Sequence, residues 1–544
     1  MATKSHLPKT DIGGMNPKLF NRIRTTLETA YFQNNVIRVE TLEEAYHLAK
    51  HSPGTVITDL PVEQPEALGL PSDAKVLLFN DGAITGRQAQ ARRIVSNETV
   101  DYYAKILREG LFENRYRTLY HATAVIGLHE KFSVKAHLLI PEGYENTLYS
   151  WMLNFQVLDT ETMAMYANSN LFDEGDILLY SDPDTFIDGH PEGLCVFDRD
   201  HNCAALFGMR YFGEHKKGSL TMAWSIAERQ GFTPCHGGLK RFETDDAQPF
   251  VMGVFGLSGS GKSTITHAKH PNLGHVTVLH DDAFVIDNTD GATVSLEPTY
   301  FDKVQDYPTD SPDHRYLLTL QNVGVTRDDT GAVVPVTEDI RNGNGRAVKS
   351  KFWTADRAYC FTEPIKAIFW IMKDDALPPL MKVHDPALAA TLGATLATKR
   401  TSAEHGADTT KLAMVPYANP FRLYPLASDY DHFKHLFEQH AVECYILNTG
   451  HFGKKKIPPH VTLSLVEAVV NKSIDLKPFE LFADLSYALS PDLVPDFNDA
   501  TYVEAFTARM RQRLEYLQQL DGEERLPKEA IDSVMSRLNL DNRK

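Results

Sequence analysis

The chain has 544 residues, and more than one compact unit is expected because single cores stop growing at about 250–300 residues. Hydrophobic residues make up 42% and charged residues 23%, as in ordinary globular proteins. The net charge of −17 disfavours nucleic-acid binding through bulk charge, and no apolar run approaches the roughly 20 residues that span a bilayer. We therefore expect a cytoplasmic protein that binds neither nucleic acid nor membranes.

The first part of the chain, residues 1–231, is predicted to form a mixed α/β domain. Residues 16–50 are predicted to be helical, because apolar side chains recur among polar ones at helical spacing. Further along, short apolar runs alternate with turn residues, as buried strands do, at residues 76–79, 136–140, 177–180 and 195–197. The glycine- and proline-containing segment 231–238 marks the expected boundary.

The second part, residues 232–544, is predicted to be a separate α/β domain. Its apolar runs predict strands at residues 250–255, 276–279, 367–371 and 442–447. The polar segment 327–349 contains the turn sequences Asp-Asp-Thr-Gly and Asn-Gly-Asn-Gly, which predict a hairpin excursion. Amphipathic patterns predict helices at residues 502–520 and 528–538, which are expected to pack on the core.

The most specific motif follows the predicted strand 250–255. It consists of Gly256, Leu257, Ser258, Gly259, Ser260, Gly261, Lys262, Ser263 and Thr264. Small residues let backbone N–H groups close on an anion, the lysine reaches the β- and γ-phosphates, and a hydroxyl binds Mg²⁺. The complete spacing after a strand predicts nucleoside triphosphate binding. The alternative is a strand-to-helix turn without a ligand.

Two further features supply candidate ligands. Asp281 and Asp282 end an apolar run 19 residues after Lys262, which leaves room for about two turns of helix and predicts a carboxylate for the metal. Helix capping is the alternative for this acid pair. Upstream lie the adjacent Lys216 and Lys217 and then His236. By spacing alone, a solvated lysine face and a structural histidine are the more common readings, and functional roles are the alternative.

The order and spacing of these motifs resemble the ATP-dependent phosphoenolpyruvate carboxykinase family. The resemblance rests on residues 211–218, 235–236, 256–264 and 281–282, and it continues through Glu297 to Lys303, residues 338–341, 376–379 and 448–450, with residues 85–87 upstream. In all it covers roughly residues 75–470.

The resemblance implies a bilobal α/β fold of the phosphoenolpyruvate carboxykinase type. A mixed α/β N-terminal domain would be followed by a P-loop nucleotide-binding C-terminal domain, with residues 335–342 returning to the N-terminal lobe. The implied reaction converts oxaloacetate and ATP to phosphoenolpyruvate, CO₂ and ADP, in gluconeogenesis or in the reverse, anaplerotic direction. A monomer or small homo-oligomer is expected.

The resemblance also assigns the residues that would hold the substrate and the metals. Arg87 and Arg341 would bind the carboxylate ends of the substrate, because guanidinium forks suit planar carboxylates, and Arg341 would also meet the transferring phosphoryl group. Tyr211 would line the carboxylate or CO₂ side, Lys216 would lie near the phosphoryl group, and Asp281 is counted with the catalytic residues.

Lys217, His236 and Asp282 would ligate Mn²⁺. A lysine ligates a metal only when neutral, so Lys217 would have to titrate far below its ordinary pKa of about 10.4.

The resemblance also assigns the residues that would contact the nucleotide. Lys262 would span the β- and γ-phosphates, Ser263 would bind the Mg²⁺ of the nucleotide, and Lys303 would contact phosphate. Glu297, Lys456 and Thr462 match positions near the nucleoside.

The surroundings of these residues depart from the family pattern. The residues after Arg87 read Gln-Ala-Gln-Ala-Arg-Arg, those after His236 read Gly-Gly-Leu-Lys, and Ala283 and Phe284 follow the acid pair. Such partners tune metal ligands. Two alternatives therefore stay open: a kinase of the same fold with another small carboxylate acceptor, and an ATP-binding relative without turnover.

Overall fold

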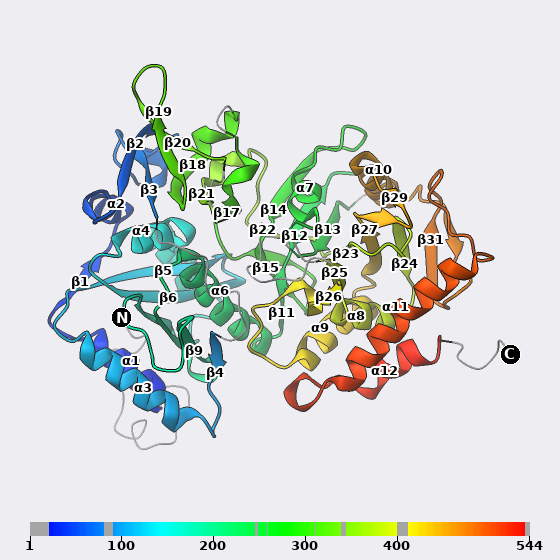
Figure 1. Ribbon diagram of the computed structural model, residues 1–544, viewed down its shortest axis with the longest axis horizontal. Helices are drawn as coiled ribbons and strands as arrows, with labels where there is room; N and C mark the ends of the chain where they lie inside the picture. The colour runs from blue at the N-terminus through cyan, green and yellow to red at the C-terminus, as the bar shows by residue number, and fades with distance from the viewer. Residues whose placement is uncertain are drawn as a thin grey trace. The chain divides into compact units, whose positions relative to one another are not determined.

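The computed structural model describes residues 21–80, 91–244, 248–257, 259–308, 311–338, 344–399 and 412–538. The protein is mixed α/β, as predicted, and divides into two compact units. The first unit comprises residues 1–226 and 296–355, and the second comprises residues 227–295 and 356–544. The chain passes from the first unit to the second after residue 226, and the segment of residues 296–355 belongs with the first unit (Figure 1).

The large sheet of the first unit has the strand order β1-β5-β6-β8-β10-β9-β4, with β7 beside β5. Its strands are β1 (Val36–Val39), β4 (Arg92–Ile94), β5 (Leu119–His129), β6 (Phe132–Pro141), β7 (Gln156–Val157), β8 (Ile177–Asp182), β9 (Leu194–Asp198) and β10 (Cys203–Phe207). The predicted strands at residues 136–140, 177–180 and 195–197 are confirmed.

Helices cover both faces of this sheet. On one face α1 (Arg22–Ala30) and α3 (Val100–Glu113) pack on alternate strand residues such as Leu178. On the other face lies α6 (Phe212–Arg229), where a Cβ on Gly218 would meet Leu179 at 3.6 Å. Because adjacent strand residues face opposite ways, β8 is buried on both sides. The remaining helices are α2 (Leu42–His51), α4 (Glu145–Asn154) and α5 (Thr160–Ala167).

The prediction of continuous helix at residues 16–50 is wrong for the described part of that range. Two helices, α1 and α2, are separated by β1, which pairs in parallel with β5. Each helix has its own start signal: Asn21 caps α1, and Thr41 forms a capping box with Glu44 at the start of α2. The β-branched run between the helices favours a strand once a sheet edge is available.

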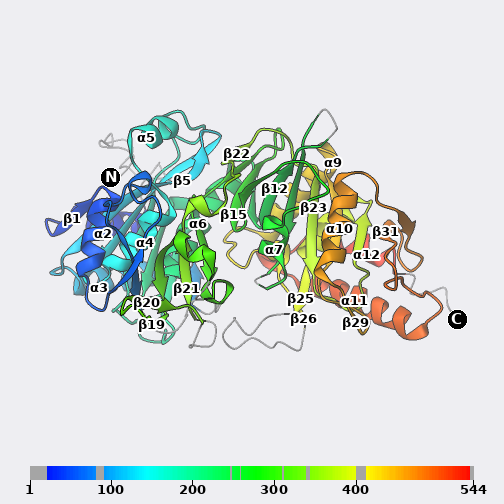
Figure 2. The same cartoon turned by 90° about the horizontal axis from the view of Figure 1, so that it is seen from above.

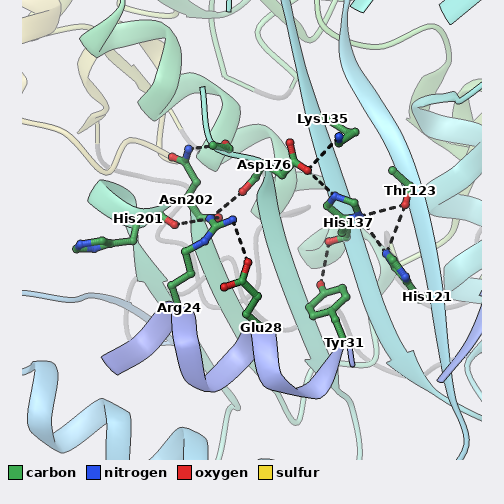
Figure 3. A network of polar contacts seen from close by, with 11 residues as sticks. Arg24, Glu28, Tyr31, His121, Thr123, Lys135, His137, Asp176, His201 and Asn202 are labelled. Atoms are coloured by element: carbon green, nitrogen blue, oxygen red, sulfur yellow. Dashed lines mark hydrogen bonds and ion pairs between the residues drawn. The ribbon is translucent and has the colours of Figure 1, made fainter. Parts of the chain in front are cut away.

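A buried polar network ties α1 to the large sheet (Figure 3). The Arg24 guanidinium donates to the backbone carbonyls of Asp176 at 2.8 Å and His201 at 2.7 Å. The Asp176 carboxylate lies 3.0 Å from His137 Nε2 and 3.1 Å from Lys135 Nζ. Burial raises the pKa of Asp176 to about 6, although Lys135 opposes the shift. These contacts give partners to some of the polar atoms that the core encloses, while Arg24 Nε and Asp176 Oδ1 have no hydrogen-bond partner among the described residues.

A second sheet in the first unit joins segments that are distant in sequence. Its strand order is β17-β21-β18-β3-β2, made by β2 (Val56–Pro61), β3 (Lys75–Phe79), β17 (Tyr300–Lys303), β18 (Leu317–Gln321) and β21 (Arg346–Lys349). The predicted hairpin excursion is present as β19 (Gly324–Arg327) and β20 (Val333–Val336), although it begins earlier than residue 327.

The large sheet of the second unit has the order β14-β12-β13-β23-β27-β24-β31-β30. Its strands are β12 (Gly238–Phe242), β13 (Phe250–Phe255), β14 (Val276–His280), β23 (Ala367–Met372), β24 (Leu380–Val383), β27 (Glu443–Asn448), β30 (Leu476–Pro478) and β31 (Leu485–Ala488). The four strands predicted for this part of the chain, at residues 250–255, 276–279, 367–371 and 442–447, are confirmed.

Two helical layers enclose this sheet (Figure 2). The residues of β13 alternate between them: Val251 and Phe255 face one core, and Met252 and Val254 face the other. The first layer consists of α8 (Pro386–Ala394), α9 (Leu426–Gln439), α11 (Ala500–Gln519) and α12 (Lys528–Met535), and the second of α7 (Lys262–His267) and α10 (Pro459–Val470). The amphipathic helices predicted near the C-terminus are α11 and α12.

Smaller sheets complete the second unit. Their strands are β11 (Phe232–His236), β15 (Ala283–Asp287), β16 (Thr293–Ser295) and β22 (Cys360–Phe361) in one sheet, β25 (Ala397–Lys399) with β26 (Leu412–Met414), and β28 (His451–Phe452) with β29 (Lys455–Lys456). In the part of the chain that the structure describes, no helix has the length and apolar character needed to cross a membrane.

Candidate active site

The candidate residues of the second unit gather at one edge of its large sheet. β13, β23 and β27 are mutually parallel, and β12 runs antiparallel to both β13 and β14. The carboxyl ends of β13, β14, β23 and β27 therefore lie at one edge, where β12 begins. In open α/β sheets this is the edge at which ligands bind.

The glycine-rich loop, residues 256–264, leaves β13 at this edge and enters α7. Gly259 and Gly261 have φ of +79° and +101°, which side chains with a Cβ rarely adopt. α7 begins at Lys262 and is only six residues long, close to the two turns predicted from the spacing. The first backbone N–H groups of a helix have no intrahelical partner and favour an anion.

Two side chains from neighbouring strand ends hold the loop. Lys373 follows β23 and donates from Nζ to the carbonyl of Gly259 at 2.5 Å, and Thr449 follows β27 and donates from Oγ1 to the carbonyl of Ser260 at 2.5 Å. Burial, and then the nearby charge of Lys456, lower the pKa of Lys373. These contacts keep the loop closed on itself.

His236 and Asp282 form the centre of the site. His236 Nε2 lies 3.0 Å from Asp282 Oδ1, and Lys262 Nζ lies 3.8 Å from the same oxygen. On the other side of the imidazole ring, Nδ1 lies 2.6 Å from the carbonyl of Ala418, so Nδ1 carries a proton and donates it. Nε2 then faces the Asp282 carboxylate, at a distance that either a proton or a shared cation bridges.

These atoms suit a divalent cation. Two ligand atoms that lie about 2.1 Å from an octahedral ion and at a right angle to each other are about 3.0 Å apart. This is the distance between His236 Nε2 and Asp282 Oδ1, which is 3.0 Å. Imidazole and carboxylate are both donors that Mn²⁺ accepts. The carbonyl of Ala418 supplies the outer contact that orients a ligating histidine.

Asp281 is buried beside this pair and faces the other way. Its Oδ2 lies 3.2 Å from His267 Nε2, at the end of α7. Burial alone would raise the pKa of Asp281, but the interaction with His267 and the charges of His280 and Lys262 outweigh it and hold the pKa well below its usual range. Asp281 therefore stays ionised and holds the end of α7.

The candidate residues of the first unit lie on or beside α6. Lys216 and Glu297 are fully buried and form an ion pair, with 3.0 Å between Nζ and Oε1. Asn154 donates to the other Glu297 oxygen at 2.6 Å. The side chain of Lys217 lies over the Trp224 ring, with Nζ 5.7 Å from the ring centroid.

Tyr211 and Lys303 also belong to the first unit. Tyr211, just before α6, is buried, and its ring centroid lies 6.1 Å from that of Phe301. Lys303 is the last residue of β17, opposite Arg346 of β21.

Known proteins match this chain over most of its length. A family model described as phosphoenolpyruvate carboxykinase matches residues 58–498. The chain belongs to the ATP-dependent phosphoenolpyruvate carboxykinase family. The resemblance predicted from the sequence motifs is thereby confirmed.

A curated relative is a phosphoenolpyruvate carboxykinase (ATP) from Aeropyrum pernix. It is 26% identical over 326 residues, which are 58% of this chain and 65% of the relative. The chain thus matches a little under two thirds of the relative's length.

In the second unit, His236, Lys262 and Asp282 lie together, and Asp281 lies beside them with its carboxylate on His267. Ser263 and Thr264 lie exposed in the first turn of α7, while Gly256, Leu257 and Ser260 are buried. Of the positions matched to the nucleoside, Lys456 is exposed on β29 and Thr462 is buried on α10. Glu297, matched to the same role, pairs with Lys216 in the first unit.

Some residues were missed or cannot be placed. The loop contacts of Lys373 and Thr449 were not predicted, although Thr449 lies in one of the motifs shared with the family. Arg87, Ser258 and Arg341 lie outside the described residues.

Proposed function

We propose that this chain converts oxaloacetate and ATP to phosphoenolpyruvate, CO₂ and ADP. Family membership and the printed name of the A. pernix relative support this reaction. The observation that carries the proposal is the convergence of His236 Nε2, Asp282 Oδ1 and Lys262 Nζ beside the glycine-rich loop. Two side chains that can bind a metal ion, next to a phosphate-binding loop, are typical of the active site of a phosphoryl-transfer enzyme.

The nucleotide would occupy the glycine-rich loop, and the second unit would be a P-loop nucleotide-binding domain. Lys262 begins α7 and would contact the β- and γ-phosphates, and the exposed hydroxyl of Ser263 would bind the Mg²⁺ that accompanies the nucleotide. Lys373 and Thr449 would keep the loop in its binding shape through their bonds to its carbonyls.

His236 and Asp282 would hold a Mn²⁺ ion. When bound, this ion supplies positive charge that stabilises a developing enolate. Lys217, matched to a further ligand of the family, lies in the first unit, and its role stays a prediction. The assignments of Arg87 and Arg341 to the substrate carboxylates also stay predictions carried by the resemblance.

In the proposed reaction, the C–C bond to the departing carboxylate breaks, CO₂ leaves, and the electron pair becomes the enolate of pyruvate. The enolate oxygen then forms a bond to the γ-phosphorus, the bond from that phosphorus to the β-phosphate oxygen breaks, and ADP leaves. No side-chain nucleophile is needed. The protein contributes positioning and charge neutralisation, with Lys262 on the phosphates.

The test is phosphoenolpyruvate formation from oxaloacetate with Mn²⁺ and Mg²⁺, measured with ATP and in parallel with GTP. We expect product with ATP and its loss in Lys262→Ala, with the thermal midpoint of the variant unchanged within a few degrees. ATP binding by wild type without product would contradict the proposal and favour a kinase with another carboxylate acceptor.

The metal assignment has a test of its own. Asp282→Asn keeps the shape of the side chain and removes its charge. The affinity of the nucleotide-free protein for Mn²⁺, measured by electron paramagnetic resonance of the unbound ion, should fall at least about tenfold in this variant, because losing a direct ligand costs no less than losing an outer partner of a ligand. Equal Mn²⁺ affinity in wild type and variant would remove Asp282 from the site.

A further inference from the structure

A buried lysine lies beneath the glycine-rich loop and takes no part in the proposed chemistry. Lys240 is on β12 and is 1% exposed. Its Nζ donates to the carbonyl of Ile265 at 2.5 Å and contacts His270 Nε2 at 2.7 Å. Its register partners on the adjacent strands, Met252 and Val278, are apolar. Burying an amine in such surroundings is unfavourable unless its donors are used.

The contacts of Lys240 continue to α10. His270 Nδ1 lies 3.1 Å from Glu467 Oε1, and the His270 ring packs edge-on against Phe242. A donating lysine requires the lone pair of His270 on Nε2, so the proton is on Nδ1 and is donated to Glu467. Lysine, histidine and glutamate thus form one chain of hydrogen bonds, in which Lys240 uses two of the three N–H donors of its protonated amine.

At its other end, this series of hydrogen bonds reaches α7, the helix that begins at Lys262. α7 runs only from Lys262 to His267, so the carbonyl of Ile265 is one of the last in the helix. The last carbonyls of a helix have no intrahelical partner and are stabilised by a cation. Lys240 fills this role at one end of a helix about 9 Å long, whose other end carries Lys262 and Ser263.

We propose that Lys240 is a positioning residue for nucleotide binding, which holds α7 against β12 and makes ATP affinity depend on the charge state of the Lys240–His270–Glu467 chain. The inference rests on the proposed function in one respect, that the glycine-rich loop binds ATP. Lys240 itself does not touch the nucleotide; it acts through α7.

The charge of this chain changes in the neutral range. Burial lowers the pKa of Lys240 to about 7, and Glu467 opposes the shift. Burial, followed by the charge of Lys240, lowers the pKa of His270 to about 4, so His270 stays neutral. Phosphate charge at the start of α7 favours the protonated form of Lys240. By linkage, protonated Lys240 then favours ATP binding, and the stabilisation is lost as pH rises through about 7.

The experiment compares ATP dissociation constants between pH 6 and pH 8 in wild type, Lys240→Met and Lys240→Gln. Lys240→Met removes the charge and the donors, whereas Lys240→Gln keeps a donor without the charge. We expect Lys240→Met to weaken ATP binding about tenfold at pH 6. The ratio of variant to wild-type dissociation constants should shrink at pH 8, because the wild type has lost its charge. Taking the ratio removes the titration of ATP itself.

Two further variants keep the result interpretable. Lys382→Met is the control: Lys382 is on β24 of the same sheet and pairs with Glu443 away from the glycine-rich loop. The ATP dissociation constants of this variant and of the wild type should be equal at both pH values. Glu467→Gln changes a side chain that is 14% exposed, so it is expected to fold even if the Lys240 variants do not. By removing the charge that supports protonated Lys240, it should move the transition in ATP affinity to lower pH.

Identical pH dependence in wild type, Lys240→Met and Glu467→Gln would overturn the inference while leaving the proposed function intact. Absence of ATP binding by the wild type would instead contradict the proposed function, and the two failures are therefore distinguishable. A loss of affinity in Lys240→Met that is the same at pH 6 and pH 8 would show a purely structural role and would also overturn the inference.

Discussion

Replacing Gly238 by alanine is expected to displace α7, because no space exists for a side chain where β12 meets this helix. An ideal Cβ on Gly238 would lie 1.9 Å from Thr266 Oγ1 and 3.0 Å from Val254 Cγ2. The first distance is about 1.5 Å shorter than an ordinary van der Waals contact. Thr266 cannot turn away freely, since its hydroxyl donates to the carbonyl of Lys262 at 2.9 Å.

The magnitude follows from these contacts. Overpacking of a core costs about 1–3 kcal/mol, and the lost hydrogen bond of Thr266 adds about 1 kcal/mol. A total of about 2–4 kcal/mol corresponds to a decrease of about 5–15 °C in the thermal midpoint of a unit of this size. Because α7 also carries Lys262, ATP affinity should fall in the same variant.

The assay is calorimetric unfolding together with ATP titration. Thr266→Ala in the Gly238→Ala background removes the 1.9 Å contact and leaves the Thr266 Cβ at 3.1 Å, so it should recover most of the lost stability. Gly175→Ala in the first unit is the control, since its Cβ would meet only Asn202 Nδ2, at 3.5 Å. If Gly238→Ala had the same thermal midpoint and the same ATP affinity as the wild type, the close packing of α7 on β12 would be refuted.

Three other substitutions test two buried acids and one lysine that contacts the glycine-rich loop. Glu297→Gln leaves the buried Lys216 without its counter-charge and should lower stability by about 3–5 kcal/mol in thermal unfolding, with partial recovery in Lys216→Met/Glu297→Gln; no loss would contradict the ion pair. Burial raises the pKa of Asp429 to about 7, so between pH 4 and 7 the unfolded state loses a proton that the folded state keeps, and stability falls as pH rises. Asp429→Asn should therefore raise the thermal midpoint at pH 8 and leave it unchanged at pH 4; an equal effect at both would refute this titration. Lys373→Met, which removes the bond to Gly259, should weaken ATP binding about tenfold, whereas unchanged affinity would mean that the loop holds its shape alone.

Local pattern was sufficient for much of the second unit. The run of residues 250–255 is apolar on both faces, as a central strand must be, and the glycine-rich loop that follows it is recognisable from spacing alone. The short distance from Lys262 to the acid pair predicted the brevity of α7 correctly. Motif order was enough to identify the family, because each motif carries a chemical requirement that few other residues meet.

The tertiary structure decided which of these local features become neighbours. β11 pairs antiparallel with β15 so that His236 lies opposite Ala283, and this pairing brings His236 to Asp282; no periodicity in the sequence encodes it. Lys373, Lys240 and Glu297 likewise acquire their partners from residues that are distant in the chain. Strand neighbours are selected by the burial of whole surfaces, a non-local quantity, whereas helix starts, turns and loop motifs depend on a few adjacent residues.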